Sequence, residues 1–390
     1  MLPAGIVASL IRARPLAEPL PQARRRWEWP LPLTLATSGA FLLHGKAWLA
    51  DLSDPLWFAF ILAWLFTAIQ LSAFAVVWHA EGLAVRLGEP LGTPVLTLSV
   101  TGIEVMMISA VMLAGEGHAT LARDAMFAVV MITLDGMLGL SLLLGVLRYR
   151  EQTYNLQGAN ALLAVIVPLA VLGLVLPNYT ASSPGPTLSP LQAGFLILMS
   201  TGLYAVFLAI QNVRHRDYFI APDDETETAR EHHPGHAVSE LRSPRHHMLL
   251  LLAYLFPAIA LSKQLAVPID YSIHAFRAPV ALGGLLVAIL ILSPESQGAA
   301  RAALANQMQR AFNILLGSAL GTIGLTIPPV LAIGLITERS IVLGLDAVDT
   351  ILLLTLAVSL LTFTNARTNV LLGAVHLLLF RAYLVLIFEK

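Results

Sequence analysis

Two glutamates lie at the middle of long apolar segments of this chain. Glu104 is the twelfth of the 23 residues from 93 to 115, and Glu295 falls at the centre of residues 284–306. A lone carboxylate at the centre of a membrane-spanning helix costs at least about 2.5 kcal/mol. Two glutamates at matched depth are hard to explain as structural residues. We therefore predict that both bind an ion and carry protons.

Other oxygen-bearing groups accompany the two glutamates. Ser318 and Thr322 are four residues apart, so their hydroxyls share one face of a helix. Ser99 and Thr101 lie on the first glutamate's segment, and Pro294, beside the second glutamate, is expected to interrupt its helix and free a backbone carbonyl. Such oxygens are the ligands of hard cations. The predicted cation ligands are Glu104, Glu295, Ser99, Thr101, Ser318, Thr322 and Asp135.

Asp135 is the third acid that falls deep within a predicted span, nearer the end predicted to face the cytoplasm. Helix packing or a proton relay explains this residue as well as ion binding does. His376 also lies within a span and is interpreted as a packed polar residue rather than a proton carrier.

The two glutamates suit an exchange of protons for a cation. Burial and a second carboxylate nearby both favour the protonated acid, whereas an arriving cation stabilises the anions and displaces their protons. Calcium takes about six to eight oxygen ligands, and sodium or potassium uses similar oxygens with fewer charges. Two acids at one site favour a divalent ion, but ligand type alone leaves all three ions open. The cation is cargo, so no resident cofactor is predicted.

The composition is that of a membrane protein. Of the 390 residues, 57% are hydrophobic and 12% are charged, whereas a soluble domain carries about 25% charged residues. The net charge of −1 gives no electrostatic reason to expect nucleic acid as a partner. The absence of cysteine excludes disulfides, thiolate metal sites and cysteine nucleophiles. The expected partners are the lipid bilayer, a transported cation and protons.

Apolar runs of about the length that spans a bilayer recur along the chain. The fold class is therefore an all-α polytopic membrane protein with about eleven transmembrane helices. The predicted spans are residues 31–50, 55–78, 93–115, 124–147, 159–177, 190–212, 247–263, 278–304, 310–336, 346–364 and 370–388.

Arginine distribution predicts the orientation of these spans. Residues 1–30 hold five arginines and no cleavable signal sequence, and the positive-inside rule keeps this segment in the cytoplasm. Alternation then puts most other loop arginines on the cytoplasmic side, namely Arg86, Arg148, Arg150, Arg214, Arg216, Arg230, Arg242, Arg245, Arg310 and Arg367. The opposite side keeps Arg123, Lys263, Arg277, Arg339 and Lys390.

The two halves of the chain follow the same order of features. Each has a mid-span glutamate, then a short basic loop, then a span rich in small residues. Residues 55–212 and 247–390 are thus predicted to be two five-helix repeats of inverted topology, the plan of many secondary transporters. Residues 31–54 hold one extra helix. The acidic, histidine-bearing residues 213–246 form a cytoplasmic linker, either a plain solvated connection or a segment that responds to cations or pH.

Three stretches carry a resemblance to a known family. They are HAEGLAVRLGEPLGTPVLTLSVTGIEV, LILSPESQGAARAALANQMQRAFNILLGSALGTIGLTIPPVL and NARTNVLLGAVHLLLFRAYL. Over residues 55–388 the chain resembles bacterial calcium/proton antiporters of the cation/proton exchanger group, within the calcium/cation antiporter superfamily, and more narrowly the branch that also exchanges sodium or potassium for protons. The resemblance implies a multi-pass protein of the bacterial inner membrane.

By this resemblance Glu104 and Glu295 correspond to the family's two ion-binding, proton-carrying glutamates. Residues 317–322 correspond to its second-half partner helix. The wider group has Gly-Asn before each glutamate, whereas this chain has Thr-Gly-Ile at 101–103 and Leu-Ser-Pro at 292–294. Hydroxyls or carbonyls must then replace the amide ligands, which affects the ion preference more than the mechanism.

The leading hypothesis is alternating-access exchange of cytoplasmic Ca²⁺, with Na⁺ or K⁺ as further substrates, for protons. One alternative is a sodium or potassium/proton antiporter that does not move calcium, and another is a cation channel without proton coupling. A membrane enzyme is not predicted, because the pair Asp223–Asp224 falls in the linker and no such acid pair lies at the end of a span. The sequence leaves ion selectivity, stoichiometry, oligomeric state and any regulatory role of residues 223–236 open.

Overall fold

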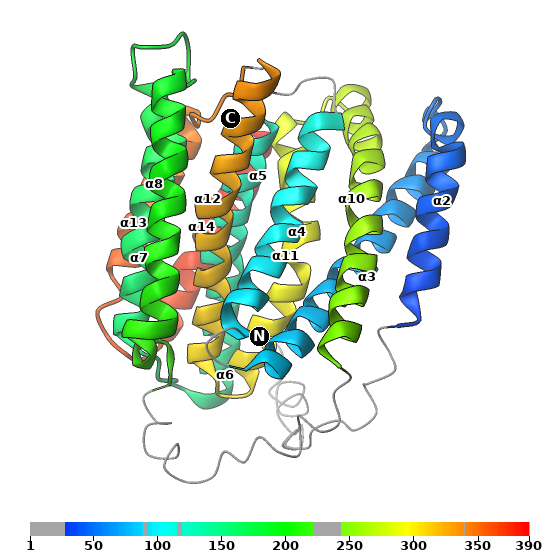
Figure 1. The fold of residues 1–390 in the computed structure, drawn as a ribbon. Helices are drawn as coiled ribbons and strands as arrows, with labels where there is room; N and C mark the ends of the chain where they lie inside the picture. Colours follow the sequence, from blue (N-terminus) through cyan, green and yellow to red (C-terminus); the bar gives the residue numbers. More distant parts are fainter. Residues whose placement is uncertain (1–27, 89–91, 115–118, 222–242, 339, 390) are drawn as a thin grey trace, which may run out of the picture.

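The structure is a computed structural model that describes residues 28–88, 92–114, 119–221, 243–338 and 340–389. Within these ranges the chain is helical, and an isolated bridge between Thr153 and Arg367 is the sole β pairing. The helices run roughly side by side, with α4, α11 and α12 near the middle of the bundle and α2 and α8 at opposite edges (Figure 1). The all-α fold class is confirmed.

Eleven helical rods occupy the described residues, close to the eleven predicted spans. Short π-helical segments join or extend some of them: η2 (Met131–Met137) connects α5 to α6, η3 (Val171–Val175) follows α7, and η5 (Ile210–Arg214) follows α8. The rods are built from α2 (Pro30–Trp48), α3 (Pro55–Leu87), α4 (Gly92–Ala114), α5 (Leu121–Val130), α6 (Leu138–Tyr149), α7 (Leu156–Ala170), α8 (Pro190–Ala209), α10 (Pro244–Ala275), α11 (Val280–Leu304), α12 (Met308–Thr337), α13 (Ala347–Leu361) and α14 (Val370–Phe388).

By length and apolar composition, nine helical stretches of the described chain can cross a membrane. Helix α13 is apolar but has 15 residues, and α2 has 19 residues but is not among the nine. Both lie where spans were predicted, and α2 packs on α3 and α10 as the extra helix.

Two details of the predicted spans are wrong. Helix α10 runs on to Ala275 rather than ending near residue 263, so Lys263 lies inside a helix and not in a loop. Its polar residues lower the local hydropathy, which hid the continuation. Helix α11 is not interrupted at Pro294. The Ser293 hydroxyl donates a hydrogen bond to the Ile289 carbonyl at 2.5 Å, one residue before Leu290, whose carbonyl the proline leaves without its regular helix donor.

Capping residues explain why several rods begin where they do. Asp54 accepts hydrogen bonds from two backbone N–H groups of the first turn of α3, and Asn155 does the same for α7. Ser189 and Gln192 form a reciprocal capping box at the start of α8. These side chains satisfy donors that a helix leaves unpaired at its N-terminus. They set the short loops that turn the chain back into the bundle.

Hydrogen bonds between loops gather several of them at two ends of the bundle. At one end, Gln152 donates to the Ala303 carbonyl, and the Thr368 backbone donates to the Gln152 carbonyl. At the other end, Arg123 donates to the Gly344 carbonyl, and the Gly344 backbone donates to Pro186. The first end also holds most of the loop arginines. We call it the arginine-rich end.

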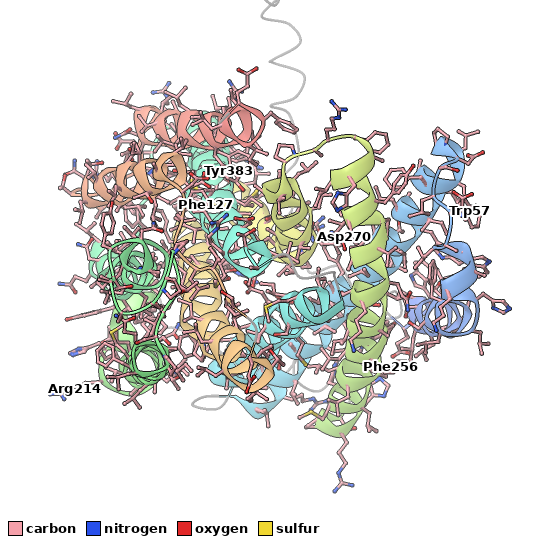
Figure 2. The ribbon with its side chains drawn as sticks, turned by 90° about the horizontal axis from the view of Figure 1, so that it is seen from above. Trp57, Phe127, Arg214, Phe256, Asp270 and Tyr383 are labelled. Atoms are coloured by element: carbon pink, nitrogen blue, oxygen red, sulfur yellow. The ribbon has the colours of Figure 1, made fainter. Side chains whose placement is uncertain are left out.

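The two halves interlock rather than forming separate bundles. Helix α4 packs against α12 of the second half, and α11 packs against α5 of the first half. Seen from above, α12 lies at the centre beside α4, with α7 and α8 on one side and α10 and α3 on the other (Figure 2). This exchange of partners agrees with two related repeats, but their boundaries at 55–212 and 247–390 stay predictions. Most of residues 1–30 and of the linker lies outside the described residues.

Candidate functional site

Glu104 lies on α4 in the interior of the bundle. Its side chain is 2% exposed, and it forms a hydrogen bond with the Thr322 hydroxyl of α12. The same hydroxyl oxygen lies 3.0 Å from the Ser318 carbonyl, one helical turn earlier. A threonine hydroxyl has a single hydrogen to donate. Thr322 can therefore donate to an ionised Glu104, or it can accept from a protonated Glu104 and donate to the carbonyl.

Glu295 lies on α11 and forms a hydrogen bond with the Ser318 hydroxyl of α12. Its side chain is half-buried, in contrast to the buried Glu104. Because Ser318 and Thr322 are one helical turn apart on α12, the two carboxylates lie near each other. The structure thus brings both predicted glutamates together on the face of α12 that carries the two predicted hydroxyls.

Thr101 lies against the same face of α12. It is 3% exposed, and its hydroxyl fills the space over Gly321, where an added Cβ would lie 2.6 Å from Thr101 Oγ1. Glycine at this position lets α4 approach α12 closely, as small residues do between membrane helices. Five of the seven predicted ligands therefore gather at the contact of α4, α11 and α12, namely Glu104, Glu295, Thr101, Ser318 and Thr322.

The other two predicted ligands are placed differently. Asp135 lies in the π-helical segment η2, is fully buried, and pairs with His376 of α14, with Oδ1 and Nδ1 2.8 Å apart. Ser99 is half-buried on α4, and no hydrogen bond joins it to either glutamate in the described chain. Neither residue lines the cavity at the site. The structure does not bring them into contact with the glutamates.

A cavity of about 490 Å³ leads from the arginine-rich end to Glu295. Its walls come from α3, α4, the end of α8, α11 and the first half of α12. Within the described residues its charged lining consists of Glu81, Glu295 and Arg310, and its polar lining consists of Thr97, Thr101, Gln211, Asn212, Asn313 and Ser318. Glu104 is not part of the lining. The site is thus reached from one end of the bundle as far as the second glutamate.

The donors at the site are oxygens. The described residues contain no group of three or more His, Cys, Asp or Glu side chains that could hold a metal ion. The oxygens that the structure brings together are those of two carboxylates and the hydroxyls beside them.

Most of the chain is similar to one family of proteins. The model of the sodium/calcium exchanger protein family matches residues 57–213 and 246–389. This chain belongs to the sodium/calcium exchanger protein family. It is 43% identical to the y4hA protein of Sinorhizobium fredii over 317 residues, which make up 81% of this chain and 85% of that one.

This family member is also 41% identical to the sodium-potassium/proton antiporter ChaA of Escherichia coli K12, over 81% of this chain and 86% of ChaA. Among solved structures, the Ca²⁺/H⁺ antiporter protein YfkE matches with a TM-score of 0.68 and 17% identity, covering 93% of this chain and 98% of YfkE. At that identity the likeness concerns the fold. The resemblance stated from the sequence motifs is confirmed at the level of the family.

Three residues of this exchanger-family site were not predicted from the sequence. Glu81 and Arg310 line the cavity, although both lie near the ends of predicted spans and were not given a role at the site. Tyr204 of α8 is 3% exposed and packs against Gly324 of α12, half a turn beyond Thr322, the hydrogen-bond partner of Glu104. Their membership depends on tertiary packing. In the sequence, the one indication of such a role was that Glu81 lies with Arg86 in the polar end of a helix.

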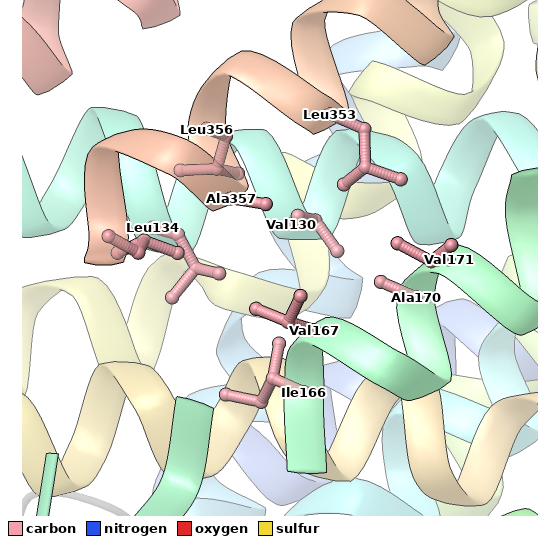
Figure 3. Close-up of a pocket in the computed structure, with 10 residues that line it drawn as sticks. Val130, Leu134, Ile166, Val167, Ala170, Val171, Leu353, Leu356 and Ala357 are labelled. Atoms are coloured by element: carbon pink, nitrogen blue, oxygen red, sulfur yellow. The ribbon is translucent and has the colours of Figure 1, made fainter. Parts of the chain in front are cut away.

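A second cavity lies apart from this site. It has a volume of about 10 Å³ and is enclosed by apolar side chains of α5, η2, α7, η3 and α13, including Val130, Val167 and Leu353 (Figure 3). Such a space holds at most one water, and its lining offers no polar partner. The packing there is a small defect of the core, not a ligand site.

Proposed function

We propose that this protein is a secondary active transporter that exchanges a cytoplasmic cation for protons by alternating access. The observation that carries the proposal is the pair of mid-helix glutamates, Glu104 and Glu295, each hydrogen-bonded to a hydroxyl of α12. One glutamate faces a cavity and the other is buried. That is the arrangement needed for a site that opens to one side of the membrane at a time.

Protons and the cation compete for the same oxygens. When Glu104 is protonated, its O–H donates to Thr322, and the Thr322 hydroxyl donates to the Ser318 carbonyl. When a cation enters, the acid ionises and Thr322 turns its hydrogen toward the carboxylate. The hydroxyl therefore satisfies both protonation states without a change in side-chain position, which lowers the cost of exchanging one for the other.

The cavity faces the cytoplasm in this proposal. The arginine-rich end is the cytoplasmic side by the positive-inside rule, which also puts the N-terminus inside and the protein in the bacterial inner membrane. The structure would then represent the inward-open state, in which a cytoplasmic cation reaches Glu295 first. Glu104 is the inner member of the pair and becomes accessible when the bundle closes on this side and opens on the other.

Calcium, sodium and potassium are the proposed substrates. Two carboxylates support Ca²⁺, as does the name of the structural relative YfkE, whereas the name of ChaA supports Na⁺ and K⁺. No resident cofactor or enzymatic activity is proposed. Ser99 and Asp135 stay predictions as ligands, with a relay or packing role for Asp135 as the alternative. Antiport of monovalent ions alone and a cation channel remain the competing functions.

The test is a transport assay on purified protein in liposomes that contain a pH indicator. A pH gradient is imposed, the membrane potential is clamped with valinomycin and potassium, and Ca²⁺ or Na⁺ is added separately; K⁺ is tested in its own set with a different clamp. We expect a cation-driven pH change in the wild type and its loss in Glu104→Gln and in Glu295→Gln. The matched control is Glu151→Gln, which makes the same substitution at a glutamate whose side chain is 59% exposed.

Full exchange by both glutamine variants would refute the two-glutamate mechanism. Cation flux that ignores the pH gradient at fixed voltage would instead indicate a channel. Proton coupling with Na⁺ or K⁺ but not with Ca²⁺ would keep the mechanism and select the monovalent alternative.

A further inference from the structure

The cavity that leads to Glu295 contains a positive charge on the path of a cation. Arg310 lies on the first turn of α12 and lines the cavity together with Glu81 of α3. Glu81 feels the charge of Arg310, but no described residue forms a direct ion pair with that arginine. No carboxylate of the described residues neutralises the guanidinium by direct contact, so its charge acts across the cavity.

The distance from Arg310 to the site follows from helix geometry. Ser318, which holds Glu295, is eight residues further along α12. At a rise of 1.5 Å per residue the backbones of the two residues are about 12 Å apart along the helix axis, which sets the scale of the distance between the guanidinium and the site. A unit charge at that range still changes ion occupancy, because the path runs through a cavity bounded by low-dielectric protein and lipid.

A fixed charge discriminates between ions by their valence. The work of bringing an ion past Arg310 is proportional to the ion's charge, so a divalent ion is repelled twice as strongly as a monovalent one. Glu81 acts in the opposite sense and attracts a divalent ion twice as strongly. With Glu81, Arg310 and an ionised Glu295, the lining carries a net charge of one negative unit. Without the arginine it would carry two.

We infer that Arg310 is a specificity-determining residue that shifts this transporter toward monovalent cations, with Glu81 as its opposing partner. The uncharged polar side chains of the cavity lining agree with this assignment. The side-chain oxygen of Asn212, whose amide nitrogen donates to the Leu208 carbonyl, can replace part of the water shell of a weakly hydrated monovalent ion, and it adds no negative charge. The inference rests on the proposed cation/proton exchange and names which ions the site prefers.

The experiment compares the ratio of Ca²⁺ to Na⁺ apparent affinity in four variants. For Arg310→Gln we expect that ratio to rise about two- to tenfold, the range for one unit charge at about 12 Å as the effective dielectric constant falls from 80 to 20. Arg310→Lys keeps the charge and should keep the wild-type ratio. Glu81→Gln removes the opposing charge and should lower the ratio.

Arg301→Gln is the matched control. Arg301 lies on the last turn of α11 at the same end of the bundle, is exposed, and does not line the cavity. The change in ratio caused by Arg310→Gln should also shrink when ionic strength is raised from 0.01 M to 0.5 M with N-methylglucamine chloride, because the Debye length then falls well below 12 Å. A packing role for the arginine would not depend on salt.

Each ratio is measured in two ways, by cation-driven proton flux in liposomes and by the cation concentration that protects the detergent-solubilised protein from thermal unfolding. If the wild type couples no cation to protons, the proposed function fails, and the protection assay still decides the role of Arg310. An unchanged ratio in Arg310→Gln, an equal change in Arg301→Gln, or a rise in Glu81→Gln would overturn the inference. So would a wild type that neither ion protects.

Discussion

Replacing Gly321 by alanine should disturb the site through packing alone. A Cβ at this position would lie 2.6 Å from Thr101 Oγ1 and 3.2 Å from Thr101 Cγ2, so turning the threonine exchanges one close contact for the other. Either α4 moves away from α12 or Thr101 leaves its rotamer. Both changes displace the helix that carries Glu104 relative to Thr322, its hydrogen-bond partner.

The free-energy cost of the close contact can be separated from the gain in helix propensity that alanine brings. Gly317 lies one turn earlier on α12, and a Cβ there would meet nothing within 4 Å. Each change from glycine to alanine favours the helix by about 1 kcal/mol. The difference in free energy of unfolding between Gly321→Ala and Gly317→Ala is then the cost of overpacking, about 1–3 kcal/mol.

The assay is unfolding in mixed micelles, followed by circular dichroism, together with cation-driven proton flux. Gly321→Ala should be the less stable variant and should transport more slowly, while Gly317→Ala should match or exceed the wild type in stability. Thr101→Ala in the Gly321→Ala background removes both close contacts and should recover most of the lost stability. Equal stability of the two alanine variants, or no recovery in the double variant, would refute the close approach of α4 and α12.

Three further outcomes follow from the same geometry. Thr322→Val should raise the cation concentration for half-maximal flux, because Glu104 loses its hydrogen bond to the Thr322 hydroxyl at a cost of about 1–3 kcal/mol. Thr326→Val is the control, because it removes a buried hydroxyl that has no hydrogen-bond partner among the described residues, and it should leave flux unchanged. His376→Ala should destabilise the fold by about 3–5 kcal/mol in mixed-micelle unfolding, because a fully buried Asp135 loses its partner, and Asp135→Asn in the same chain should recover part of that loss. Lowering the pH on the cavity side should raise the half-maximal cation concentration in liposome flux, since protons and cations compete for the same carboxylates; an affinity independent of pH would contradict that competition.

Local features of the sequence predicted much of the fold and the central residues of the site. Apolar runs of bilayer length located the helices, and the anomaly of an acid at mid-span singled out Glu104 and Glu295. The four-residue spacing of Ser318 and Thr322 predicted a shared helix face, and in the structure that face meets both glutamates. Each of these inferences used the residues of a single helix. Periodicity and hydropathy are properties of single helices, so they were enough to make the predictions.

The remaining features depend on residues far apart in the chain. Asp135 pairs with His376, 241 positions away, and nothing near either residue specifies the other. Glu81 and Arg310 gain their roles from the shape of a cavity that five rods enclose. The long α10 was cut short because Lys263 and Asp270 look like the end of a span, whereas the helix continues through them. Hydropathy reports solvent preference and not where a backbone stops hydrogen-bonding to itself.

The two predicted repeats differ in the side chains that they bring to the site. Ser318 and Thr322 lie 23 and 27 residues after Glu295, and the same steps from Glu104 arrive at Phe127 and Met131, which are buried and apolar. Neither position offers a hydroxyl, so the hydroxyls that bond to the two glutamates both come from α12. A shift of α12 along its axis would alter both hydrogen bonds together, and the Thr322–Ser318 carbonyl contact links the two acids through one turn of helix. In the proposed exchange, movement of this one helix would give proton binding at one glutamate a physical means of affecting cation release at the other.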